Sequence, residues 1–235
     1  MTESREAPPV SERSPGTKAV RPRDAATLIL YRRHGGAVEV LMGERHGNHS
    51  FLPNQYVFPG GRVDPSDSRV RVARDLDPAD FDRLCRAANP TRARALAAAA
   101  IRETFEETGL LIGGVDPEPG KPAPTGWQEF FAHGYAPALD PLRYVVRAVT
   151  PPYRHKRFDA RFFIADAAHA EGRIKGSGEL LDLRWVTLEE ALTLDLPRMT
   201  AIVVKRIQEL IDRPRAGASV TTFIYRHGKH TVTEE

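Results

Sequence analysis

Three glutamates, Glu103, Glu106 and Glu107, lie within five residues of one another in a segment whose composition predicts a helix. Residues at positions i, i+3 and i+4 share one face of a helix, so the three carboxylates would be neighbours. They would also lie near the C-terminal end, where the helix dipole disfavours each anion by roughly 0.3–1 kcal/mol. A divalent cation would relieve both penalties, so the spacing predicts a metal site.

Carboxylate oxygens are hard ligands, which favours Mg²⁺ or Mn²⁺ with water and substrate phosphates completing the shell. Arg102 lies beside Glu103 and four residues before Glu106, so it could orient a carboxylate. A Glu-rich turn by itself is more often a solvated, charged helix end than a site. Two other segments of this chain favour a metal site over a solvated helix end.

The first segment is the turn at residues 58–61, Phe-Pro-Gly-Gly. Its paired glycines, Gly60 and Gly61, let the backbone approach a ligand closely and free a carbonyl to point at a metal. The second is a glycine-containing loop that ends at Glu179, just before an expected strand at residues 183–186. A loop carboxylate at this place could reach a metal-bound water.

The elements that must position these groups can be predicted from caps and periodicity. The helix with the glutamates is expected over residues 92–108, with Thr91 as its N-cap and Gly109 as its stop. A shorter helix is expected over residues 78–86, with Asp77 as its N-cap.

Short apolar or alternating runs predict the strands, and residues 32–36 predict a hairpin turn between the first two. The expected strands are residues 25–31, 38–42, 56–58, 143–149, 161–165, 183–186 and 220–225. Further helices are expected at residues 127–133, from a capping box at Thr187 and Glu190, and at residues 199–211. Strands mixed with several helices indicate an α/β fold.

Composition limits the classes of function. The chain has 235 residues, 41% of them hydrophobic, and a net charge of +3 that is dispersed, which argues against a nucleic-acid partner. Cys85 is the only cysteine, so no intramolecular disulfide can form. No stretch approaches the ~18 apolar residues of a membrane span. Residues 1–23 predict a polar tail without a secretory signal, so we expect a cytoplasmic protein.

Taken together, these features resemble the signature of the Nudix hydrolases: Gly, a spacer, Glu, seven residues, then Arg-Glu-apolar-x-Glu-Glu-x-Gly-apolar. Gly61 matches its first position, and Thr104 is a soft match at an apolar one. The distal half is matched by Arg102, Glu103, Glu106, Glu107, Gly109 and Leu110. The resemblance covers roughly residues 25–211. It implies an α/β/α sandwich around a mixed sheet and hydrolysis of a diphosphate linked to another group.

The chain departs from the signature in its first half. Five residues normally separate the Gly from the first Glu, whereas here about thirty, residues 62–93, intervene, and Arg94 occupies the position eight before Arg102. The first acidic residue is therefore interpreted as missing or replaced. A helical insertion at this point resembles the split Nudix box of a subgroup related to coenzyme A diphosphatases. On this basis the Nudix domain would span residues 24–213, with a strand and polar tail over 214–235.

Members that hydrolyse coenzyme A carry an upstream pattern, Leu-Leu-Thr-x-Arg-Ser, followed by Arg, Gly and Phe-Pro-Gly-Gly. The chain can be aligned with this pattern without a gap, and the positions that agree are Leu41, Arg45 and the turn at residues 58–61. The positions that disagree are Gly43, His46, Ser50 and Asn54. Coenzyme A or an acyl derivative is therefore one candidate substrate, with ADP-ribose, NADH and nucleotide sugars as alternatives. A nucleotide-sensing module without catalysis is an alternative of another class, which the intact glutamates disfavour.

The resemblance assigns roles to single residues. Metal ligands would be Glu103, Glu106 and Glu107, with a carbonyl of Gly60 or Gly61. Glu179 is the candidate general base, with Glu103 as the alternative, and Arg102 has an orienting role in catalysis. The candidate substrate contacts are Arg45 on a phosphate, His46, His49 and Tyr56, with Trp127 as a stacking residue or a core residue. The partner would be a small nucleoside diphosphate derivative, and a homodimer is left open.

Overall fold

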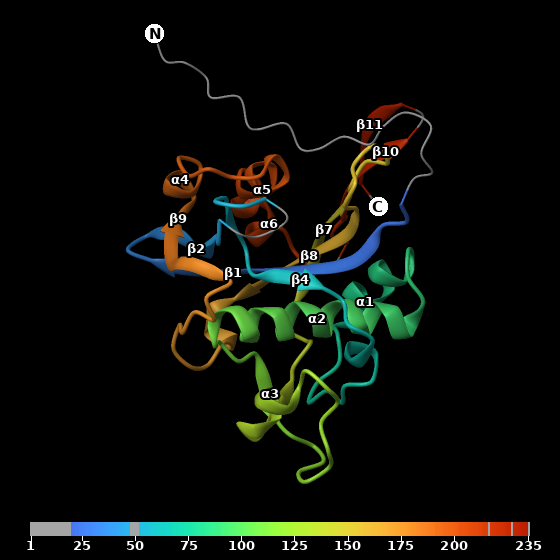
Figure 1. The fold of residues 1–235 in the computed structure, drawn as a ribbon, viewed down its shortest axis with the longest axis vertical. Coiled ribbons are helices and arrows are strands. Elements are labelled where there is room, and N and C mark those ends of the chain that lie inside the picture. Colours follow the sequence, from blue (N-terminus) through green and yellow to red (C-terminus); the bar gives the residue numbers. More distant parts are fainter. Residues whose placement is uncertain (1–19, 48–51, 216, 227, 235) are drawn as a thin grey trace.

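The computed structural model describes residues 20–47, 52–215, 217–226 and 228–234. Within them, a mixed nine-stranded sheet has the order β11-β10-β7-β8-β1-β2-β3, with β4 paired to β1 and β9 paired to β2 (Figure 1). Its strands are β1 (Arg23–His34), β2 (Ala37–Arg45), β3 (Tyr56–Val57), β4 (Gly60–Arg62), β7 (Arg143–Val149), β8 (Phe158–Asp166), β9 (Leu180–Thr187), β10 (Thr221–Arg226) and β11 (Lys229–Glu234). The β1–β8 and β7–β10 pairs are parallel, and the other pairs are antiparallel.

Helices cover both faces of this sheet (Figure 1). One face carries α2 (Pro90–Thr108), with α1 (Pro78–Cys85) beside its N-terminal end. Beyond α2 lie α3 (Gln128–Ala132) and a small second sheet of β5 (Gly113–Val115) and β6 (Tyr135–Pro137). The opposite face carries α4 (Leu188–Ala191), α5 (Arg198–Val204) and α6 (Ile207–Asp212). Short 3-10 turns are η1 (Pro65–Ser68) and η2 (Ala167–His169). The predicted α/β/α arrangement is confirmed.

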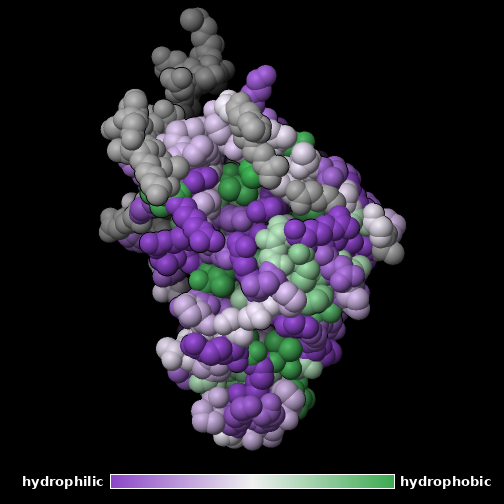
Figure 2. All heavy atoms as spheres, turned by 90° about the vertical axis from the view of Figure 1, so that its right-hand side faces the viewer, coloured by the Kyte–Doolittle hydropathy of each residue, from purple (hydrophilic) through white to green (hydrophobic). Residues whose placement is uncertain are grey.

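Two apolar clusters fill the two sides of the sheet. Leu28 and Leu30 of β1 face the cluster that includes α2, and Ile29 between them faces the cluster that includes α5 and α6. All three side chains are fully buried, which explains why β1 has a continuous apolar run instead of alternation. On the face of the molecule drawn in Figure 2, hydrophobic side chains lie in small groups among hydrophilic ones.

The first hairpin forms as the glycine pair predicts. Gly35 and Gly36 have φ of +58° and +82°, and His34 pairs with Ala37 across them. A two-residue turn with both central φ values positive matches the twist of the flanking strands, and glycine adopts it without strain. The strands run up to the glycines on both sides, so the turn is shorter than the predicted segment of residues 32–36.

The helix that carries the glutamates begins two residues earlier than expected. Asn89, and not Thr91, is its N-cap, because the Asn89 Oδ1 accepts a hydrogen bond from the Arg92 N–H at 2.9 Å. Thr91 lies inside the first turn and is exposed. At the other end the predicted stop is confirmed: Gly109 adopts φ +74° and its N–H donates to the Phe105 carbonyl.

Two other expectations were wrong in detail, and one strand was missed. The helix expected over residues 199–211 is broken between α5 and α6, where the guanidinium of Arg206 turns to the Thr221 hydroxyl and the Glu234 carboxylate. The polar tail expected after Tyr225 contains β11, which pairs with β10. The strand expected over residues 56–58 does end before the Pro-Gly-Gly turn, as β3, but β4, which was not expected, begins at Gly60 and pairs with β1. Such pairings are tertiary and leave no local pattern.

Other elements match their predictions. β7 has the bounds expected from the sequence, α1 begins at Pro78 with Asp77 as its N-cap, and the Thr187 side chain caps α4. Among the residues that the structure describes, no helix combines the length and apolar character needed to cross a bilayer.

The two candidate caps of α2 can be separated by substitution. Asn89→Ala should lower the free energy of unfolding by about 1 kcal/mol, because it removes an acceptor from the first turn. Thr91→Ala should change it by less than about 0.5 kcal/mol, since Thr91 is an exposed position inside the helix. Urea unfolding measures both values, and a larger effect at Thr91 would contradict the assignment.

Candidate active site

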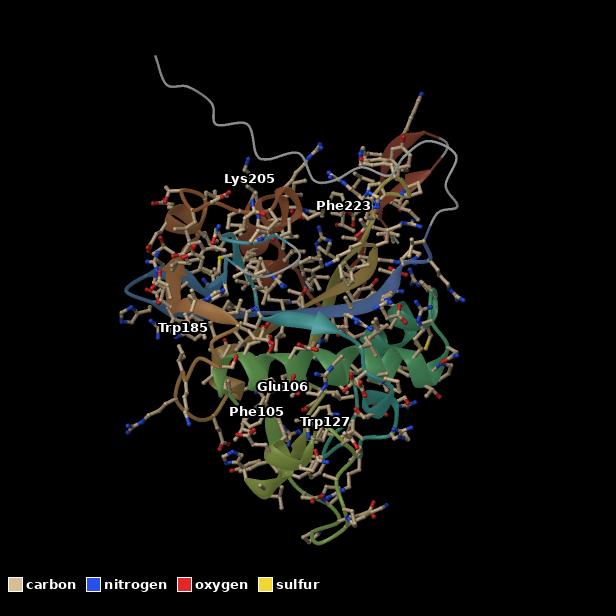
Figure 3. The ribbon with its side chains drawn as sticks, viewed as in Figure 1. Phe105, Glu106, Trp127, Trp185, Lys205 and Phe223 are labelled. Atoms are coloured by element: carbon tan, nitrogen blue, oxygen red, sulfur yellow. The ribbon has the colours of Figure 1, made fainter. Side chains whose placement is uncertain are left out.

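The last two turns of α2 bring their carboxylates against the turn that opens β4. The Glu107 carboxylate accepts a hydrogen bond from the Gly60 N–H at 2.8 Å and is buried. The Glu103 carboxylate lies over Gly61 so closely that a Cβ on that residue would be 2.3 Å from it. Glu106 is the most exposed of the three, with 43% of its side chain accessible to solvent (Figure 3).

Both glycines of the turn are needed for this approach. A Cβ on Gly60 would lie 2.5 Å from the Ala26 carbonyl oxygen, and Gly60 has φ +154°. The expectation was that the turn presents a carbonyl to a metal. The contact present is made by the Gly60 N–H to Glu107, so this peptide group holds a carboxylate in place.

Burial dominates the electrostatics of the three glutamates. It raises the pKa of Glu103 to about 7 and the pKa of Glu107 to about 8, and it also raises the pKa of Glu106. Repulsion adds to burial, since Glu106 raises the pKa of Glu103, and Glu103 raises that of Glu107. The end of α2 therefore disfavours the charged form of these carboxylates, and the nearby basic groups only partly oppose that effect.

Arg102 is the positively charged side chain that forms ion pairs with two of these glutamates. Its Nη1 contacts the Glu103 carboxylate at 3.0 Å and the Glu106 carboxylate at 2.9 Å. Its Nε and Nη2 donate to the two oxygens of Asp67 at 2.8 and 3.0 Å, and Nη2 also donates to the Arg62 carbonyl. The predicted orienting contact of Arg102 with the glutamates is present in the structure.

Asp67 is the site residue that sequence reasoning missed. Counting back eight residues from Arg102 leads to Arg94, but Arg94 lies on the exposed side of α2 and pairs with Asp75. The fully buried carboxylate that pairs with Arg102 belongs to Asp67. Five residues separate it from Gly61, which is the spacing of the signature, so counting forward from the glycine would have found it.

The structure brings Glu179 and Arg45 to the same end of α2. Charge on Glu179 contributes to the raised pKa values of Glu106 and Glu107, and Arg45 acts on Glu107 in the opposite direction. The backbone N–H of His46 donates to the Glu179 carbonyl at 3.3 Å, so the end of β2 and the loop before β9 are joined beside the glutamates.

Two further residues lie elsewhere: Tyr56, predicted as a substrate contact, and Trp127, predicted as a stacking or a core residue. Tyr56 packs against the cluster on the α5–α6 side of the sheet, and its hydroxyl donates to Asp182 at 2.6 Å. Trp127 is fully buried below α2, so it has no free face for a base (Figure 3). The direction in which the Tyr56 side chain leaves β3 decides the first placement, and the packing of α3 against α2 decides the second. His49 lies outside the described residues.

The donor set suits a hard divalent cation, because such ions bind carboxylate oxygens. A bound cation would also stabilise the charged form of these carboxylates, which burial disfavours. Across the described ranges, no three carboxylate, imidazole or thiolate groups already converge on one point where an ion could lie. Arg102 holds Glu103 and Glu106, and the Gly60 N–H holds Glu107.

Comparison with known proteins gives an informative relative among the solved structures. No protein-family model matches the chain, and no curated protein matches it. The crystal structure of a NUDIX hydrolase from Alicyclobacillus acidocaldarius is 30% identical, over 80% of this chain and 91% of that chain, with a TM-score of 0.61.

Two further solved structures are more distant. The NUDIX domain of NrtR from Shewanella oneidensis, complexed with ADP ribose, is 13% identical over 82% of this chain and 90% of that one, with a TM-score of 0.48. RenU, a Nudix hydrolase from M. Smegmatis, is 20% identical over 85% and 92%, with a TM-score of 0.46. At this distance neither carries an argument about function.

The two candidates for the acidic partner of Arg102 differ in their expected energetics. Asp67→Asn should lower the free energy of unfolding by about 3 kcal/mol, because it breaks a buried ion pair. Arg94→Ala removes an exposed pair with Asp75 and should cost at most about 1 kcal/mol. Denaturant unfolding of both variants measures the difference, and equal, small effects would contradict the assignment of Asp67.

Proposed function

The chain belongs to the Nudix hydrolase family and is a pyrophosphohydrolase of that type, and from this premise we propose the groups that do its chemistry. The proposed substrate is a nucleoside diphosphate joined to another group. Glu103, Glu106 and Glu107 are the proposed ligands of Mg²⁺ or Mn²⁺. The observation that carries the proposal is the packing of two α2 carboxylates, Glu103 and Glu107, against the Gly60–Gly61 turn.

The signature's first half can be matched on the same basis. We take Asp67 as its first acidic residue, because Asp67 pairs with Arg102 and follows Gly61 at the five-residue spacing. The insertion then follows Asp67, and it contains α1, instead of beginning at residue 62. The domain proposed for residues 24–213 is unchanged, and the β10–β11 hairpin adds two strands to its sheet.

A divalent ion at this site would supply charge that stabilises the phosphate oxygens and lowers the pKa of an attacking water. The protein groups have separate tasks around it. Arg102 holds Glu103 and Glu106 in place through ion pairs, and the Gly60 N–H holds Glu107 through a hydrogen bond. Gly60 and Gly61 also offer carbonyls as further ligands.

Glu179 is the proposed general base, with Glu103 as the alternative. Its support is its position: it is exposed, on a loop, and close enough to Glu106 and Glu107 to raise their pKa values. A base must reach the water that attacks phosphorus, and a loop carboxylate beside the ligands can do so. Arg45, on the same side, is proposed to bind a substrate phosphate.

The group attached to the diphosphate is the open part of the proposal. Coenzyme A or an acyl derivative is favoured by the match at Leu41, Arg45 and the turn at residues 58–61. Arg45 is a residue of that pattern and also acts on Glu107, which supports its use in binding a phosphate. ADP-ribose, NADH and nucleotide sugars are the alternatives that the same chemistry would accept.

The reaction can be tested on a panel of coenzyme A, acetyl-coenzyme A, ADP-ribose, NADH, dinucleoside polyphosphates and a nucleotide sugar. With Mg²⁺ or Mn²⁺ the unaltered chain should cleave at least one of them. Glu106→Gln should reduce kcat by at least about 10²-fold, because it removes a proposed metal ligand. Its free energy of unfolding should fall by no more than about 1 kcal/mol, since the Glu106–Arg102 pair is partly exposed.

Arg94→Ala is the matched control, because it lies on α2 away from the glutamates and should retain full activity. Full activity in Glu106→Gln would remove Glu106 from the ligand set. Silence of the unaltered chain across the panel would favour a nucleotide-sensing role.

The assignment of the base is tested by Glu179→Gln. We expect kcat to fall about 10²-fold with KM little changed, because a general base acts in the chemical step. Glu171→Gln is the matched control. Glu171 lies at the other end of the same loop, where its carboxylate accepts a hydrogen bond from the Tyr135 hydroxyl. Normal turnover by Glu179→Gln would exclude Glu179 as the base and leave Glu103 as the alternative.

A further inference from the structure

Asp67 is held by more than its arginine. Its Oδ1 accepts hydrogen bonds from the Arg102 Nε at 2.8 Å and from the indole Nε1 of Trp127 at 3.0 Å. Its Oδ2 accepts from the Arg102 Nη2 at 3.0 Å and from the Asp64 N–H at 2.8 Å. A carboxylate has about four lone-pair sites. All of them are used, so the orientation of this buried side chain is fixed.

Trp127 is itself rigid. It is fully buried, and its ring makes edge contacts with Phe130 at 5.4 Å and Phe131 at 6.4 Å between centroids. Phe130 contacts Phe105 of α2 in the same way at 5.3 Å. Figure 3 shows Phe105 and Trp127 on the same side of α2, toward α3. The indole N–H therefore has one direction in which to donate, and Asp67 lies there.

The contacts form one continuous path to the glutamates. Trp127 holds Asp67, Asp67 holds one edge of the Arg102 guanidinium, and the other edge contacts Glu103 and Glu106. A guanidinium is planar and rigid, so fixing one edge fixes the other. Without the indole N–H, the Asp67 Oδ1 would keep only the Arg102 Nε as a donor, so Asp67 would hold the arginine less firmly.

We propose that Trp127 is a positioning residue of the active site, which sets the placement of Glu103 and Glu106 through Asp67 and Arg102. This rests on the proposed function of those two glutamates as metal ligands. The role differs from a purely structural one. A structural tryptophan would support α3 through its ring, whereas this role depends on the single N–H group.

Metal affinity tests the proposal without a substrate. Binding of Mn²⁺ alone is measured from the electron paramagnetic resonance signal of free Mn²⁺, below the unfolding temperature of each variant. Trp127→Phe keeps an aromatic ring but lacks the donor, and we expect Mn²⁺ affinity to fall about 10-fold, as for partners that orient metal ligands. Phe130→Leu disturbs the aromatic cluster without touching Asp67, and its affinity should stay within about twofold of the unaltered chain.

A second measurement needs no substitution at Trp127. The chain has two tryptophans, so a ¹⁵N-labelled sample gives two indole N–H signals, which Trp185→Phe assigns. Mg²⁺ should shift the Trp127 signal, because binding changes the charge that Arg102 and Asp67 face. This reading holds even if Trp127→Phe fails to fold.

Three outcomes would overturn the positioning role alone. They are unchanged Mn²⁺ affinity in Trp127→Phe, an equal loss in Phe130→Leu, and a Trp127 indole signal that Mg²⁺ does not move. Absence of Mn²⁺ binding by the unaltered chain would instead overturn the proposed function, and the positioning role with it.

Discussion

The ion pair between Arg102 and Asp67 is the interaction on which the arrangement of the site depends. Removing two charges from water costs several kcal/mol per ion, and attraction offsets this only when the remaining hydrogen bonds are satisfied. Here both edges of the guanidinium have partners, and both carboxylate oxygens have two donors each. The pair is therefore better understood as a fixed reference point than as a source of stability. It joins the segment after β4 to α2 and to α3.

Close packing of α2 on the sheet makes the rest possible. The stretch from Ala97 to Ala100 has side chains that are at most 1% exposed, and a helix with small residues there can lie near the strands. The glycines at the start of β4 remove the remaining obstruction, so Glu103 and Glu107 reach the backbone of the turn. Because the same approach excludes water, it also raises the pKa values of both carboxylates.

Local signals predicted much of this from the sequence. The glycine pair of the first hairpin, the Gly109 stop of α2 and the bounds of β7 depend on neighbouring residues, and each was confirmed. The N-cap failed by two residues, because Asn89 and Thr91 are both good caps and only geometry decides between them. The break between α5 and α6 depends on Arg206 reaching β10 and β11, which periodicity cannot reveal.

The site residues also divide into those that local sequence predicts and those that depend on distant segments. The face shared by the three glutamates follows from helix geometry, whereas the partner of Arg102 lies in a distant segment. Counting across an insertion led to Arg94, because a fixed spacing assumes that no residues have been added. The indole contact of Trp127 has no sequence signature, since a buried tryptophan is usually a packing residue. Tyr56 was misplaced because alternation along a two-residue strand cannot be fixed without its pairing partners.

The contact between Asp67 and Arg102 also closes a loop in the chain. The cost of closing a flexible loop grows only with the logarithm of its length, by about 0.6 kcal/mol per doubling. Lengthening the loop from the seven residues of the signature to the thirty or so present here is about two doublings, or roughly 1.2 kcal/mol. Burial of apolar side chains in the insertion, such as Leu76 and Leu84, can offset that amount. An enzyme of this family can thus gain a helix in the middle of its signature at little entropic cost, provided the two ends still meet.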